Sequence, residues 1–315
     1  MKVKGRVKNF APSALLLIMA IATLVAVPLR TYQLVNLIEP KTGFYAKIDV
    51  SVIVLYALLA VSCLLIFIFS YLSSSIPKPE FKENKSTILG VCAVFLTLAF
   101  LFDSVYQIDV FTQIYNGYAE SLVKGATYYI KSGGIAVAIQ SLFAVLSAVY
   151  FSILSASYFK GRKFYETNRL LALCPIIWGL SRIIQRFIEP ISFKNVSELL
   201  IQMFMLAFML IFFLSFARIA SRVNSEKSSW VLFATGLSTV ILAMTSALSS
   251  VVVLIMGKVD ILYTKFPITF ADIFIAIFIV ALLLDFMPTK SEIEEMNNGN
   301  VELVEEGNEE SQEVN

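Results

Sequence analysis

The feature that most constrains this chain is a set of long apolar runs with no charged residue inside them. Residues 50–72 and 199–217 are the clearest examples. A run of about 18 residues or more can cross roughly 30 Å of hydrocarbon as a helix. Backbone polar groups in lipid must be bonded within their own segment, so these runs are predicted to be helices. No apolar/polar period of 3.6 survives in them, which argues against a soluble amphipathic bundle.

The composition agrees with a membrane protein. Hydrophobic residues make up 58% of the 315 residues and charged residues only 15%, whereas soluble domains carry about a quarter charged residues. We therefore predict an all-α, polytopic transmembrane helical bundle with about eight spans. The expected spans are roughly 11–29, 50–72, 87–105, 134–158, 169–188, 197–217, 229–256 and 267–286.

The first span has a second interpretation. Its basic start, residues 1–10, followed by an apolar stretch with the small residues Ala22 and Ala26 near its end, also resembles a cleavable signal peptide. A retained helix is favoured, because the apolar run is long for a signal sequence. Cleavage would leave seven spans instead of eight.

Basic residues indicate the orientation of the threading. If the N-terminus is cytoplasmic, 15 of the 25 lysines and arginines fall in the inner segments, which are also the shorter ones. This asymmetry follows the positive-inside rule and predicts that both termini are cytoplasmic. We expect a multi-pass protein of the cell membrane, with the lipid bilayer as its first partner.

The chain divides into an integral membrane domain, residues 1–288, and a tail, residues 289–315. From 287 to 315 there are nine glutamates and one lysine. Such a polar, acidic segment cannot bury enough apolar surface to order itself, so a disordered cytoplasmic tail is predicted. Alternatively, the tail covers basic inner loops such as residues 159–164 as an electrostatic brake. The longest outer connection, 106–133, is too short for a soluble domain.

The sequence lacks the residues and motifs that several kinds of catalytic and metal-binding site require. The chain has no histidine, which removes histidine acid/base catalysis and histidine metal ligands. Its three cysteines are far apart in the sequence and predict neither a zinc site nor an outer disulfide. Phosphate loops, nucleophile elbows and glycine-rich dinucleotide motifs are also missing from the sequence. We predict that the protein is not an enzyme and that it uses neither a metal, a cofactor nor nucleic acid.

The strongest functional lead is a group of charges near the outer ends of three expected spans. Arg182, Arg186 and Glu189 lie on one side of the fifth span, Asp103 ends the third and Asp272 begins the eighth. Three interpretations remain open. The arginines extend to outer headgroups, they pair with the carboxylates and lock the bundle, or they line a pocket for an anion.

These residues lead to two hypotheses about function. The first is a small-solute permease or membrane-embedded binding protein with an outward-facing site. In it Arg182 and Arg186 hold an anionic small molecule, and Asp103 and Asp272 orient them. Because the candidates sit near span ends, a proton relay through the bilayer is not expected. The alternative is a membrane sensor or scaffold subunit that binds a protein partner at the cytoplasmic face, through the inner loops and acidic tail.

Three smaller features complete the expectations. A stripe of serines and threonines in the seventh span, residues 235–250, is typical of close helix packing and less typical of a polar path. Pro175 in the fifth span is expected to bend that helix near its inner end. The tyrosine-rich segment 106–133 is expected to lie along the outer leaflet or to cover an outer pocket.

Overall fold

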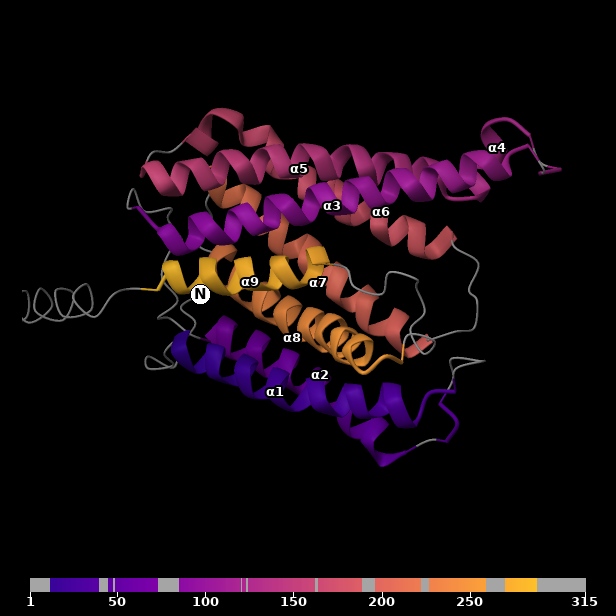
Figure 1. Cartoon of the computed structure of the whole chain (residues 1–315). Helices are drawn as coiled ribbons and strands as arrows, with labels where there is room; N and C mark the ends of the chain where they lie inside the picture. The colour runs from indigo at the N-terminus through magenta and orange to yellow at the C-terminus, as the bar shows by residue number, and fades with distance from the viewer. Residues whose placement is uncertain are drawn as a thin grey trace, which may run out of the picture.

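Long helices run back and forth across the computed structural model, and nearly all of them are roughly antiparallel to their neighbours in sequence (Figure 1). The structure describes residues 12–39, 45–47, 49–72, 85–119, 121–122, 124–161, 164–188, 196–221, 227–258 and 270–287. Its elements are α1 (Pro12–Asn36), α2 (Val50–Leu72), α3 (Thr87–Gly117), α4 (Ala126–Lys131), α5 (Gly134–Lys160), the 3-10 helix η1 (Phe164–Leu173), α6 (Cys174–Ile188), α7 (Val196–Ala220), α8 (Lys227–Ile255) and α9 (Phe270–Asp285).

Among the described residues, seven helical stretches are long and apolar enough to cross a membrane, so the protein is a multi-pass membrane protein. They are Pro12–Asn36, Val50–Leu72, Thr87–Gly117, Gly134–Lys160, Arg169–Ile188, Glu198–Ala220 and Ser229–Ile255. The set includes the first helix, so it is not the set of seven that signal cleavage would leave. The expected eighth span corresponds to α9, of which 16 residues are described. Its crossing, like the orientation of the termini, stays a prediction.

The helices form two outer groups with a central layer between them. In Figure 1, α3, α5 and α6 lie at the top, α1 and α2 at the bottom, and α7, α8 and α9 between them. The packing agrees: α8 contacts α1, α2, α7 and α9, while α9 also packs on α3. Of the spanning helices α8 is the most enclosed, with 67% of its most apolar window buried inside the bundle.

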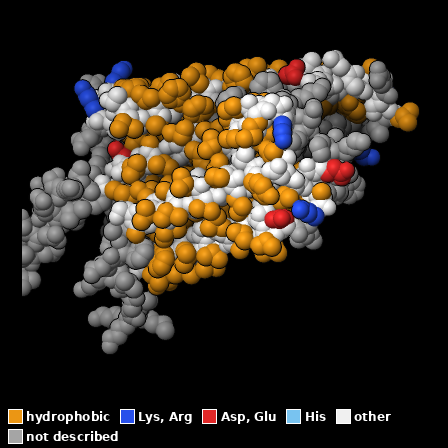
Figure 2. Space-filling view, turned by 60° about the horizontal axis from the view of Figure 1, so that its bottom comes forward, with side chains coloured by type: hydrophobic (Ala, Val, Ile, Leu, Met, Phe, Trp, Pro, Cys, Tyr) orange, Lys and Arg blue, Asp and Glu red, His pale blue; other side chains and the backbone are white. Residues whose placement is uncertain are grey.

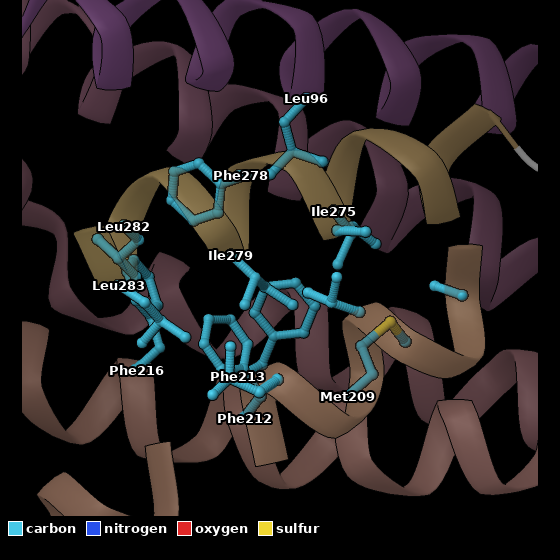
Figure 3. Close-up of a cluster of buried hydrophobic side chains, with 14 of the residues drawn as sticks. Leu96, Met209, Phe212, Phe213, Phe216, Ile275, Phe278, Ile279, Leu282 and Leu283 are labelled. Carbon is cyan, nitrogen blue, oxygen red and sulfur yellow. The ribbon is translucent and has the colours of Figure 1, made fainter. Parts of the chain in front are cut away.

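Aromatic side chains fill the middle of the bundle. Phe212, Phe213 and Phe216 of α7 belong to the same buried cluster as Phe278 of α9 (Figure 3). The ring centroids of Phe216 and Phe278 are 6.1 Å apart, and Phe151 of α5 meets Phe278 edge to face at 5.3 Å. Aromatic pairs at this spacing add to the free energy gained by burial. The outer flank is also apolar: Figure 2 shows hydrophobic side chains over most of it, with charged ones mainly toward the ends. Such a flank suits contact with lipid tails.

The hydroxyl stripe of the seventh span lies on α8 and is buried against neighbouring helices. Its hydroxyls mostly donate to the carbonyl four residues earlier in the same helix, as in Thr235, Thr239, Thr245, Ser249 and Ser250. This bonding satisfies those five hydroxyls within α8 itself. The geometry therefore supports the packing interpretation of the stripe.

Two helices continue beyond the ends that the apolar runs predict. Helix α1 reaches Asn36 instead of ending at 29, and α3 reaches Gly117 instead of ending at 105. In Figure 1 the ends of α3 and α5 project past the other helices together with α4. There the rings of Tyr118, Tyr128 and Tyr129 contact one another. The tyrosine-rich segment is thus mainly the tip of a helical hairpin.

The region around Pro175 also differs from the expectation. The 3-10 helix η1 occupies Phe164–Leu173, and α6 begins at Cys174. Pro175 therefore stands in the first turn of α6, where its missing N–H leaves no helical carbonyl unbonded. The helix type changes just before Pro175, and the bend itself stays a prediction.

Candidate functional site

A buried ion pair joins α6 to α9. The guanidinium of Arg182 donates from Nη1 to Oδ1 of Asp272 at 2.6 Å and from Nη2 to Oδ2 at 3.1 Å. Arg182 is 6% exposed and Asp272 is 3% exposed. Helix α6 packs mainly on α5 and α7, and α9 packs on α3 and α8. The pair therefore links two helices that are not primary packing neighbours.

The Asp103 carboxylate lies beside this pair and is held by uncharged donors. Trp178 Nε1 donates to Oδ2 of Asp103 at 2.7 Å, and Gln140 Nε2 donates to the same oxygen at 3.1 Å. The Arg182 guanidinium stacks over the Trp178 ring, 4.8 Å from its centroid, and interacts electrostatically with Asp103. A cation over an indole face is attracted by the ring quadrupole. Trp178 thus connects the aspartate to the arginine.

Local helix geometry explains this arrangement. Trp178 and Arg182 are four residues apart, so they share one face of α6. Asp272 is the third residue of α9, where free N–H groups at the helix start favour a negative charge. Asp103 and Gln140 face each other across the seam between α3 and α5, where the neighbouring Ser104 and Ser141 hydroxyls are 3.0 Å apart.

The structure brings together three of the five predicted site residues: Arg182, Asp272 and Asp103. Arg186 lies one turn further along α6 and is partly exposed, so it is not buried with Arg182. Glu189 lies outside the described residues. Because Arg182 is buried and paired, the interpretation that it extends to the headgroup layer is wrong. Whether the cluster binds a ligand stays a prediction.

The position of Asp103 within its helix also departs from expectation. It was predicted at the outer end of the third span, but α3 continues for several further turns to Gly117. Asp103 therefore lies near the middle of its helix. The argument that all ionisable candidates sit at helix ends does not hold for this residue.

A second buried ion pair was not predicted. Arg30 of α1 is fully buried, and its Nη2 lies 2.8 Å from Oε2 of Glu198 on α7. The Ser246 hydroxyl of α8 donates to Oε1 of Glu198, and Arg30 Nη1 donates to the Tyr45 hydroxyl at 2.9 Å. The expected first span ends at residue 29, which leaves Arg30 just outside it, and the expected sixth span begins at 197, one residue before Glu198. The only sequence signal was an acid at the start of a span and an arginine just past an apolar run.

The two pairs share a layout. In each, the arginine lies six residues before the last residue of its helix, α1 or α6, and the acid is the third residue of α7 or α9. Since α1 and α6 run in the same direction, both pairs lie toward the same end of the bundle. Buried pairs cost desolvation and chiefly fix geometry. At that end the pairs connect α1 to α7 and α6 to α9.

The chain was compared with known protein families, curated proteins and solved structures. A scan against protein-family models finds no match, and searches of the curated proteins and of the solved structures find no significant match either. The functional argument therefore depends on the buried residues themselves.

Proposed function

We propose that this multi-pass membrane protein is a small-solute permease or membrane-embedded binding protein. Its site is the cluster of Arg182, Asp272, Asp103, Trp178 and Gln140, which faces outward when both termini are cytoplasmic in the cell membrane. One observation carries the proposal: a two-pronged Arg–Asp pair buried between helices that are not primary packing neighbours. Ionisable groups inside a membrane bundle are costly and mark functional sites by default. The proposal assigns no catalytic step to the chain.

The ligand class follows from the chemistry of the pair. A guanidinium fork binds any carboxylate or phosphate with the same two parallel hydrogen bonds. Asp272 thus occupies the position that an anionic small molecule would take on Arg182. The indole of Trp178 keeps the guanidinium of Arg182 in place while the anion of the solute replaces the Asp272 carboxylate. Displacement of Asp272 would release α9 from α6, which couples solute binding to a change in the bundle.

The test is uptake by purified protein in liposomes. Labelled small carboxylates and inorganic phosphate serve as probes, each compared with liposomes that lack protein. Arg182→Ala removes the fork, whereas Arg182→Lys keeps the charge but loses the paired geometry. Arg218→Ala is the control, because Arg218 is an exposed arginine in the last turn of α7.

We expect both Arg182 variants to lose uptake of the anion that the wild type carries, while Arg218→Ala retains it. Size-exclusion chromatography establishes that each variant is folded. The proposal fails if folded Arg182→Ala carries the anion at the wild-type rate, or if none of the anions enters above the protein-free level.

The alternative of a sensor or scaffold subunit depends on the acidic tail and the inner loops. The tail, 289–315, and most of these loops lie outside the described residues. No structural observation favours this alternative over the site at Arg182.

A further inference from the structure

We propose that Asp103 and Gln140 bind a sodium ion beside the Arg182–Asp272 pair. This inference deepens the proposed function and rests on it, because the cation would accompany the anionic solute. It is carried by the charge at Asp103 and by two amide oxygens near it.

The first step concerns charge. Both hydrogen bonds to Asp103 come from uncharged groups, the Trp178 indole and the Gln140 amide, and both fall on Oδ2. The nearby guanidinium of Arg182 already forms two hydrogen bonds with Asp272. Counted by themselves, the side chains of Arg182, Asp272 and Asp103 carry a formal charge of −1. A bound monovalent cation would bring it to zero.

The second step concerns oxygen ligands. Gln140 is 1% exposed, and its Oε1 accepts no hydrogen bond from any described residue. Since its Nε2 donates to Asp103, the carbonyl of the same amide lies next to the carboxylate. Gln107 lies one turn beyond Asp103 on α3, is 5% exposed, and its Oε1 is likewise without a donor in the described chain. Buried acceptors normally have a partner.

The third step is access. Asp103 shares the inward stripe of α3 with Phe100 and Gln107, which are both buried. Asp103 itself keeps partial exposure. The proposal requires the exposed part of Asp103 to face water and not lipid.

The ligand set selects the ion. Carboxylate and amide oxygens are hard donors, which suit alkali and alkaline-earth cations. A calcium ion takes six to eight oxygens and commonly several carboxylates, while here Asp272 is already engaged by Arg182. One available carboxylate with neutral amides therefore favours a monovalent ion. A proton on Asp103 is the competing occupant.

The test measures sodium binding to the purified full-length chain. Its thermal midpoint in detergent is compared in sodium chloride, potassium chloride and choline chloride at equal ionic strength and fixed pH. Radioactive sodium binding provides a direct readout. At ten times the dissociation constant, sodium should raise the folded-to-unfolded ratio about elevenfold, which corresponds to a Tm increase of about 2 °C.

We expect the sodium effect to disappear in Asp103→Asn. It should persist in Asp109→Asn, the matched control, because Asp109 is an exposed aspartate further along the same helix. If Asp103→Asn does not fold, Gln140→Leu and Gln107→Leu keep the carboxylate and should weaken sodium binding by about tenfold. The inference is overturned if wild type shows no sodium-specific effect, if Asp103→Asn retains it, or if only pH changes the Tm.

The experiments can refute the sodium site and the permease independently of each other. Sodium that binds at Asp103 in a protein that carries no anion would support this site and refute the permease. Uptake that depends on Arg182, in a protein without sodium binding, would support the permease and overturn this site.

Discussion

Removing one partner of the Arg182–Asp272 pair should destabilise the protein far more than removing both. Arg182→Met leaves the Asp272 carboxylate buried at 3% exposure without its two guanidinium bonds. Breaking a buried pair on one side costs about 3 kcal/mol or more. For a chain of this size that corresponds to a decrease in Tm of about 5 °C. Asp272→Leu should cost a similar amount, because it leaves the guanidinium unpaired.

The double variant, Arg182→Met with Asp272→Leu, should unfold within about 1 kcal/mol of the wild type. Apolar residues of similar volume can replace a buried pair at little cost. Thermal unfolding of the purified proteins in one detergent, with equal heating rates, measures the three changes. Double-variant cycles isolate the coupling between the two residues.

One result would refute this reasoning. If the double variant loses the sum of the two single losses, the residues do not act as a pair. The double variant also separates structure from function. If it regains stability and carries anions at the wild-type rate, the pair stabilises the bundle but does not form the binding site.

Two further predictions concern other positions. Arg30→Met should lower the free energy of unfolding by about 3 kcal/mol, because it leaves Glu198 without its guanidinium partner. Arg186→Gln should lower it by less than about 1 kcal/mol, because Arg186 is partly exposed. Equal losses of stability in thermal unfolding would contradict this ranking. Gly236→Leu should lower the free energy of unfolding by about 1–3 kcal/mol through overpacking, because a Cβ at this position already lies 3.0 Å from the Phe212 ring. An unchanged Tm would show that α7 and α8 can separate freely.

The positions of most helices could be predicted from the apolar runs, because lipid imposes helical backbone on such segments. The ends of α1 and α3 could not. Both helices continue into stretches that hold polar residues, whose hydrogen bonds the apolar runs do not reveal. In α1, Arg30 and Gln33 find partners on other elements of the bundle, whereas in α3 the exposed Gln113 bonds Asp109 one turn earlier in the same helix. Arg30 is the clearest case: it looks like a loop residue in sequence, yet it is fully buried.

Only part of the candidate site could be predicted from the sequence. Arg182, Asp103 and Asp272 were predicted as site residues because charges inside spans are rare and these three were expected at the same depth in the bilayer. Which acid pairs with which arginine depends on packing between segments 90 residues apart. Gln140 carries no charge and did not stand out, although it helps to hold Asp103.

The hydroxyls of α8 have a consequence for how the protein is made. This helix is the most enclosed of the spanning helices, and its neighbours include α9, which follows it in the chain. During synthesis α8 must therefore meet lipid before its last neighbour is present. Because its serines and threonines mostly bond to carbonyls of their own helix, they need no other helix to satisfy them. The helix can therefore insert into the bilayer by itself and remain stable there until α9 is inserted and packs against it.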